Sequence, residues 1–439
     1  MEPRRIKDNT SYESDAFDNI GNLIKKVANK TLEQLEYEGV LVFPKLARDA
    51  EDLSKDQMIL QDVNGKINSG NVIGFIGYGN ERLIIKSRFA GEDDHFFLYL
   101  LNRVMNIPNI VDLKTDANQD ERLFNYLVFL FPYYLKNAMR KGLYKKYIRQ
   151  EYNDGNVKGA IDIARHIKTN TPFIGKVAYS QREFSFDNFL TELVRHTIEF
   201  IKSKPYGRSI LHGVNDEIRL IVEATPRYEH YDRLKIIEQN KKNSIHHAFY
   251  QEYLALQRLC LLILRHEKHL IGSGSRQIYG ILFDGSWLWE EYINTIIKED
   301  FYHPMNKAQL YGQKLFNKNT GLIYPDFISR NFEKRIIVDA KYKPKRNIKN
   351  QDYLQLLAYM FRFESKTGYY IYPEVDNAED TFWMNRGTSF EYGSVYPRDD
   401  VCITKYGFKI PMGVVDFTDF ALKMEISEQQ LKNDFSFAN

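Results

Sequence analysis

Residues 321–359 constrain the fold of this chain more than any other stretch. Two short apolar runs, Leu322–Ile328 and Arg335–Tyr342, have the length and the residue types of neighbouring strands, and a polar, charged segment separates them. The first run carries Asp326 directly after Pro325. The pattern predicts two paired strands followed by a helix.

The second run carries Asp339 and Lys341, two residues apart. Side chains alternate between the faces of a strand, so these two should share one face while Val338 and Ala340 point into the core. With Asp326 on the neighbouring strand, this arrangement predicts an acidic pocket with one cation beside it. Oxygen ligands of this kind suit Mg²⁺, or Mn²⁺ as an alternative, with the carbonyl of Ala340 as a further ligand. Lys341 would orient the attacking water or stabilise charge on phosphorus during phosphodiester hydrolysis.

A simpler interpretation is that Asp-x-Lys forms a solvated charge pair at a strand edge. Against it, cations crowd around the motif although the net charge of the whole chain is only +3. They are Arg330, Lys334, Arg335, Lys341, Lys343, Lys345, Arg346 and Lys349. A basic rim around an acidic pocket suits a phosphate backbone. We therefore predict that Lys343, Lys345 and Arg346 contact DNA.

The motif resembles the PD-(D/E)xK nuclease signature, with Pro325–Asp326 as its first half and Asp339–Lys341 as its second. In the expected helix that follows, Gln355 and Tyr359 stand at i and i+4 on one face. This pair resembles the helix of RecB-like nucleases that faces the metal site and the DNA. The resemblance implies a restriction-endonuclease-like α/β/α domain.

With 439 residues, 43% of them hydrophobic and 27% charged, the chain should form a globular, multi-domain α/β protein. We expect a mixed α+β domain over residues 1–135, with a hairpin turn at Gly77–Asn80. A mostly helical region should follow over residues 136–270. Leu123–Arg149, which leads into this region, is predicted to be a helical stretch interrupted at Pro132. Residues 271–439 should form the α/β/α domain.

Two cysteines, Cys260 and Cys402, have no partners at metal-ligand spacing, which argues against a zinc site. The histidines of residues 246–247, 266 and 269 match no standard metal-site spacing and are expected at the surface. The N-terminus lacks the apolar core of a signal peptide, and no apolar stretch is long enough to span a bilayer. We therefore expect a cytoplasmic protein without membrane contact.

Three segments of the middle region carry a second resemblance. Gly142–Tyr147, Gly159–Asp162 and Phe186–Leu190 resemble, in this order, motifs of the McrC family. Members of this family are subunits of McrBC-type modification-dependent restriction systems and end in a PD-(D/E)xK domain. One departure is Ala160, which stands where the family usually has arginine.

The segment 286–300 resembles the helix that precedes the nuclease motif in McrC proteins, and places Glu290 at the position of the family's glutamate. In many nucleases of this fold, a glutamate of the first helix completes the metal site. The resemblance thus implies Glu290 as a metal ligand, whereas the adjacent Glu291 shows that such an acid can also be a surface residue.

Together, the resemblances imply a Mg²⁺-dependent DNA endonuclease subunit whose partner is a separate McrB-like AAA+ GTPase ring. The chain contains no G-x-x-x-x-G-K-[ST] motif, so it should bind no nucleotide of its own. By resemblance, residues 1–135 would enter the partner ring. Three alternatives remain open: a non-catalytic regulator of an AAA+ NTPase, the nuclease subunit of a LlaJI-type sequence-specific system, and a stand-alone RecB-like repair nuclease.

Overall fold

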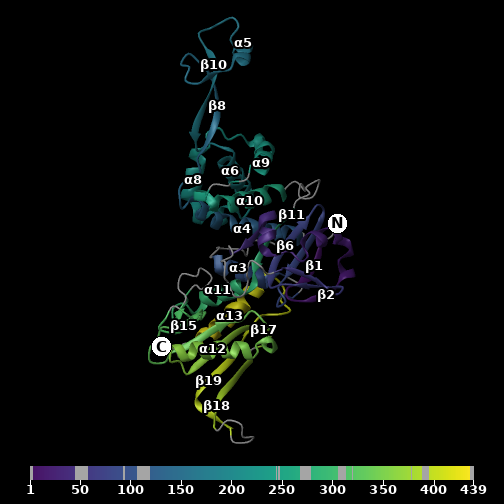
Figure 1. Cartoon of the computed structure of the whole chain (residues 1–439), viewed down its shortest axis with the longest axis vertical. Helices are drawn as coiled ribbons and strands as arrows, with labels where there is room; N and C mark the ends of the chain where they lie inside the picture. Colours follow the sequence, from purple (N-terminus) through teal and green to yellow (C-terminus); the bar gives the residue numbers. More distant parts are fainter. Residues whose placement is uncertain are drawn as a thin grey trace. The chain divides into compact units, whose positions relative to one another are not determined.

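The computed structural model describes residues 3–44, 58–91, 94–105, 119–243, 245, 248–266, 278–304, 313–318, 320–376, 378–387 and 395–435. The chain divides into two compact units (Figure 1). One unit combines Met1–Val111 with Gly272–Asn439, and the other consists of Asp112–Ile271. This division differs from the three consecutive domains expected from the sequence, because the two ends of the chain fold together.

A five-stranded sheet in the first unit explains why the two ends fold together. Its order is β1 (Arg4–Lys7), β7 (Glu81–Lys86), β6 (Val72–Tyr78), β11 (Ile278–Asp284) and β3 (Val40–Phe43). Strands β6 and β7 form the predicted hairpin, with Tyr78 opposite Glu81. Strand β11 follows the second unit in the sequence, yet it pairs with β6 and β3 and lies between them.

Smaller elements cover this sheet and close an apolar core. They are the three-stranded sheet of β2 (Ser11–Glu13), β5 (Lys66–Ser69) and β4 (Leu60–Val63), with η1 (Ser14–Ile20), α1 (Gly21–Val27) and α2 (Leu32–Glu38). Thr31 caps α2 in a capping box with Gln34. Apolar side chains of α1 and α2, among them Leu23 and Leu35, pack with strand residues such as Ile76 in one buried cluster. The predicted mixed α+β character of this region is thus confirmed.

The second unit is largely helical, but it also contains a sheet that the sequence interpretation missed. Its longer helices are α4 (Gln119–Met139), α6 (Phe189–Lys202), α8 (Asn215–Ala224), α9 (Arg233–Lys242) and α10 (Gln251–His266), with the short α7 (Gly207–Leu211). Strands β8 (Lys146–Asp154), β10 (Val177–Ser185) and β9 (Ala160–Ile161) form an antiparallel sheet with α5 (Ile163–Thr169) beside it.

The prediction of a helical stretch over Leu123–Arg149 with a break at Pro132 was wrong about both the break and the end of the helix. Helix α4 continues through Pro132, because proline removes one backbone donor without necessarily ending a helix. The helix ends at Met139, whose carbonyl oxygen accepts a 2.9 Å hydrogen bond from the N–H of Gly142. Gly142 has a φ of 86°, in the left-handed region that glycine adopts readily after a helix.

The second sheet of the first unit has the order β12 (Phe301–Tyr302), β15 (Phe327–Ser329), β16 (Ile336–Ala340), β17 (Thr367–Glu374), β19 (Val395–Lys409) and β18 (Ala378–Gly387). Strands β15 and β16 are antiparallel, β16, β17 and β19 are parallel, and β18 returns antiparallel to β19. A separate pair, β13 (Gln313–Lys314) and β14 (Leu322–Ile323), precedes β15.

Helices cover both faces of this second sheet. On one face, Leu356 and Met360 of α12 (Asn350–Arg362) lie against Gly368 of β17. On the other face, Trp289 of α11 (Gly285–Ile297) donates to the carbonyl oxygen of Ile371 (3.1 Å). Helix α13 (Phe417–Phe435) lies on that same side, and α3 (His95–Met105) packs on α11 and α13. The expected α/β/α layering is therefore present.

None of the helices among the described residues combines the length and apolar character that crossing a membrane would require.

Arg88 connects the two sheets of the first unit. Its guanidinium lies 3.2 Å from the buried Asp8 carboxylate, and it donates to the side chain of Asn71 and to the carbonyl oxygen of Tyr342 (3.0 Å). It also lies 4.8 Å from the centre of the Tyr342 ring. Burial raises the pKa of Asp8 to about 6, although Arg88 acts in the opposite direction. Tyr342 directly follows Lys341, so this cluster anchors the end of the predicted catalytic strand.

We predict that Arg88→Met lowers the free energy of unfolding by about 3–5 kcal/mol at pH 8, because it leaves the Asp8 carboxylate buried without its cation. The loss should be smaller at pH 5, since below a pKa of about 6 the Asp8 carboxyl is mostly neutral in the folded state. Urea titrations of both proteins at the two pH values measure the loss. An equal loss at pH 5 and pH 8 would show that the ion pair is not its cause.

Candidate active site

The register of β15 and β16 brings the two motif aspartates together. Phe327 pairs with Val338, so the next position along the ladder places Asp326 opposite Asp339. The backbone N–H of Ala340 donates to Asp326 Oδ2 over 2.8 Å. The predicted pairing of the two strands is confirmed. The run Leu322–Ile328 is not one strand, however, because β14 ends at Ile323 and β15 begins at Phe327. Pro325, which lacks a backbone donor, lies in the gap before β15.

Lys341 lies beside these carboxylates, as the same-face pattern predicted. Its Nζ is 2.9 Å from Asp339 Oδ2 and donates to Gln355 Oε1 over 3.3 Å. Asp339 is only 3% exposed. Helix α12 therefore delivers Gln355 to the cluster, while Tyr359 is buried one turn later in the core that contains Leu356. The contact of Tyr359 with DNA stays a prediction.

The basic residues predicted to contact DNA have different surroundings. Lys343 forms an ion pair with Asp352 (2.6 Å), and Lys345 forms one with Asp380 (2.9 Å). Arg346 is exposed, and within the described ranges no carboxylate pairs with it. Of the three, Arg346 is the cation most available to a phosphate.

Glu290 reaches the same cluster from α11. The side chain is buried, at 5% exposure, and its charge acts on Asp326. Burial, followed by the negative charges of Glu290 and Asp339, raises the pKa of Asp326 well above its ordinary value, and Lys341 offsets only part of this rise. The charges of Glu290 and Asp339 thus lie close enough to oppose the ionisation of Asp326.

His303 is a member of the cluster that the sequence analysis missed. Its Nδ1 lies 2.8 Å from the carbonyl oxygen of Asp326, which can only accept, so Nδ1 carries the proton. Its Nε2 lies 3.7 Å from Glu290 Oε1 and 3.6 Å from Glu291 Oε1, and its ring stacks on Phe327. Burial alone would lower the pKa of His303, but the neighbouring glutamates raise it above its ordinary value.

No local sequence motif indicates a functional role for His303, which follows the two-residue strand β12. The histidines that the sequence analysis assigned to the surface are not tested, because residues 246, 247 and 269 lie outside the described part of the chain and the exposure of His266 is not described. Both cysteines are free thiols, and Cys260 is buried.

The carboxylate oxygens of this cluster fit a hard divalent cation, although they do not form a complete coordination shell. Among the described residues, no group of three or more His, Cys, Asp and Glu side chains is arranged to hold a metal ion. The charges of Glu290 and Asp339 nevertheless raise the pKa of Asp326, which is the repulsion that a bound cation would relieve. Oxygen donors without a thiol favour Mg²⁺ or Mn²⁺ over zinc.

We predict that Asp326→Asn stabilises the metal-free protein by about 0.5–2 kcal/mol at pH 8, because the amide removes one of the mutually repelling charges. Asp352→Asn is the matched control. Burial alone would raise the pKa of Asp352, but its hydrogen bond with Lys343 lowers it, so this substitution should destabilise by about 1–3 kcal/mol. Denaturant titrations in EDTA measure both; destabilisation by Asp326→Asn would contradict the proposed repulsion.

Comparisons with known proteins identify the family of the chain. No curated protein matches the chain. A refined half-complex of Thermococcus gammatolerans McrB AAA+ hexamers with bound McrC aligns at 14% identity and a TM-score of 0.48, covering 98% of this chain and 100% of that chain. The cryo-EM structure of the McrBC complex from the same organism aligns at 15% identity and a TM-score of 0.33, covering 68% and 87%. A family model described as "McrBC 5-methylcytosine restriction system component" matches residues 67–373, more than half of the sequence. The chain therefore belongs to the family of McrBC 5-methylcytosine restriction system components.

Proposed function

We propose that this chain is the Mg²⁺-dependent DNA endonuclease subunit of a McrBC-type restriction system. One observation carries the proposal: Asp326 and Asp339 occupy opposite positions of one strand pair, with Lys341 2.9 Å from Asp339 and Glu290 close enough to affect Asp326. Asp326, Asp339 and Lys341 match the PD-(D/E)xK motif, and Glu290 joins them from a separate element, α11. A solvated charge pair would not explain why Asp339 and Glu290 are buried.

Each group has a role in phosphodiester hydrolysis. Asp326, Asp339 and Glu290 would hold Mg²⁺, or Mn²⁺ in its place, with the carbonyl oxygen of Ala340 as a further ligand. When bound, the cation polarises the phosphate and lowers the pKa of water. Lys341, held by Asp339 and Gln355, would orient the attacking water or stabilise the negative charge that develops on the phosphate oxygens.

Membership of a restriction-system family and the absence of a P-loop in the whole sequence support a separate nucleotide-hydrolysing partner, an AAA+ GTPase ring of the McrB type. In the Thermococcus gammatolerans half-complex, McrC is bound to McrB AAA+ hexamers. The assignment of the contact to residues 1–135 stays a prediction.

The second unit offers another candidate surface for this partner. Strands β8 and β10 pair over nine residues, and with α5 they project from the helices of their own unit (Figure 1). Apolar side chains near this end are exposed: Ile163 by 69%, Phe173 by 66% and Ile174 by 65%. Such a patch marks an interaction site, and a ring subunit with an apolar groove would cover it.

Two aspartate substitutions distinguish the surfaces. We expect Phe173→Asp to weaken binding to the AAA+ partner at least tenfold, roughly the effect of losing one buried aromatic anchor. Tyr37→Asp, on α2 at 88% exposure, should leave binding unchanged. Surface plasmon resonance with immobilised partner measures both. Loss of binding in the Tyr37 variant alone would favour residues 1–135 instead.

Cleavage of plasmid DNA tests the proposed activity. Wild type should cut methylated plasmid in the presence of Mg²⁺, GTP and the AAA+ partner, and Asp339→Ala should reduce the rate at least 100-fold because a metal ligand is lost. The matched control is Asp380→Ala, which removes an acid paired with Lys345 outside the cluster. Equal cleavage by wild type and Asp339→Ala would refute the site.

The other outcomes separate the remaining candidates. Cutting by the isolated chain, without GTP or partner, would indicate a stand-alone RecB-like repair nuclease. Cutting of unmethylated DNA at a defined sequence would indicate a LlaJI-type system. Stimulated GTP hydrolysis by the partner without any cleavage would indicate a non-catalytic regulator.

A further inference from the structure

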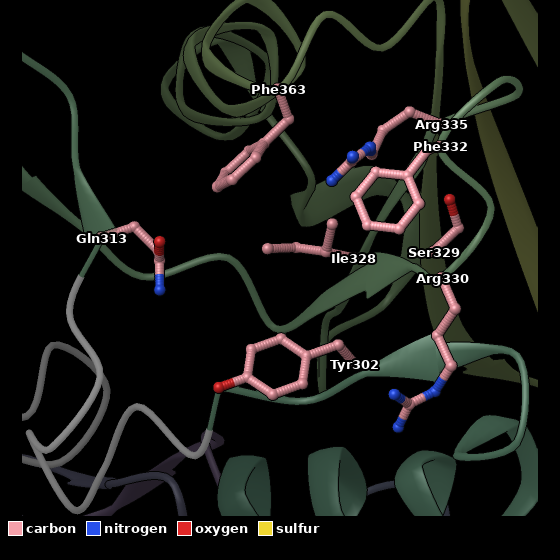
Figure 2. Close-up of a pocket in the computed structure, with 8 residues that line it drawn as sticks. All are labelled: Tyr302, Gln313, Ile328, Ser329, Arg330, Phe332, Arg335 and Phe363. Carbon is pink, nitrogen blue, oxygen red and sulfur yellow. The ribbon is translucent and has the colours of Figure 1, made fainter.

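A small pocket lies at the other end of the β15–β16 hairpin from the aspartates (Figure 2). Its volume is about 340 Å³, within the range of small-ligand sites. The residues that line it are Tyr302, Gln313, Ile328, Ser329, Arg330, Phe332, Arg335 and Phe363. Nothing in the proposed catalytic chemistry uses these side chains.

The lining combines aromatic rings with positive charge. The rings of Tyr302, Phe332 and Phe363 stand on different sides of the pocket, and Arg330 and Arg335 are its charged members (Figure 2). Among the described residues, no acid lines the pocket and neither arginine forms an ion pair with a carboxylate. Aromatic faces suit a nucleobase and guanidinium groups suit a phosphate, so the pocket has the two chemistries that a nucleotide presents.

Phe332 is the unusual member of this set. Its side chain is 84% exposed, and the Arg335 guanidinium lies 4.7 Å from the centre of its ring. An exposed phenyl ring that stacks with a cation beside a polar pocket gives little to the stability of the fold. It is, however, a suitable platform for a base that has left its duplex stack.

The hairpin links this pocket to the aspartates. Because Ile328 pairs with Ile337, alternation places Asp326, Ile328 and Arg330 on the side that also carries Asp339 and Arg335. Arg330 lies four positions after Asp326, just past the end of β15, so the two Cα atoms are roughly 13 Å apart if the chain is extended. A separation of this size is short enough for one DNA strand to reach both places.

We propose that the pocket binds an unstacked nucleotide of the DNA strand that is cut, with its base on Phe332 and its phosphate on Arg330 and Arg335. The proposal rests on the proposed nuclease function and extends it. Tyr302 and Gln313 are lining residues whose side chains carry groups that can hydrogen-bond to an edge of the base, whereas the buried Ser329 hydroxyl already accepts from the N–H of Ile336 (2.9 Å).

Binding of a bulged duplex to the full-length chain tests this assignment. The probe is a DNA duplex with 2-aminopurine as a one-nucleotide bulge, compared with the same duplex without the bulge, both in EDTA so that no strand is cut. Wild type should quench the fluorescence of 2-aminopurine and bind the bulged duplex about tenfold more tightly, as expected for one stacked base. Phe332→Ala should lose this preference, and Arg335→Ala should lower the salt slope of binding by about one.

Phe361→Ala is the matched control. Phe361 is exposed by 87% on α12 and does not line the pocket, so this variant should keep the wild-type preference. If Phe332→Ala also keeps the preference while wild type still cuts plasmid with its partner, the pocket assignment is wrong and the nuclease function stands. If wild type neither binds DNA nor cuts it under any condition, both fail. If free GTP displaces the quenched base in wild type but not in Phe332→Ala, the pocket serves a free nucleotide and the DNA assignment is overturned.

Discussion

The candidate active site depends on the register of one short strand pair. The 2.8 Å hydrogen bond from the Ala340 N–H to Asp326 Oδ2 joins a motif carboxylate to the strand that carries the other one. A shift of one residue would turn Asp326 to the opposite face and separate it from Asp339. Apolar side chains on both strands, such as Ile328 and Ile337 in the core under α12, hold this register.

The catalytic elements also depend on the N-terminal part of the chain. Strand β11 completes the five-stranded sheet and leads directly into α11, which carries Glu290 and whose first turn is capped by Asp284. Arg88 holds the carbonyl of Tyr342, next to Lys341. The elements that carry Glu290 and Lys341 are therefore positioned by contacts with β6 and Arg88, which lie far away in sequence, and residues 278–435 should not fold as an independent piece.

The sequence predicted those parts of the site that reside in local patterns. Alternation within five residues placed Asp339 and Lys341 on one face, and the resemblance to the helix of RecB-like nucleases placed Gln355 near them. Pairings between strands far apart in sequence could not be predicted from local patterns, because no sequence pattern near β11 indicates that it joins β6 and β3. The same limit concealed His303, whose partners come from α11 and from the residue before β15. Strand β8 was assigned to a helix, because its apolar and aromatic residues suit either structure until Gly142 ends the helix before it.

Mn²⁺ binding, followed by electron paramagnetic resonance, tests whether Asp326, Asp339 and Glu290 form a binding site for a divalent cation. We predict that the full-length chain binds Mn²⁺ without DNA or partner, that Mg²⁺ competes, and that Asp339→Asn weakens binding about tenfold or more. Unchanged Mn²⁺ affinity in the Asp339→Asn protein would contradict it.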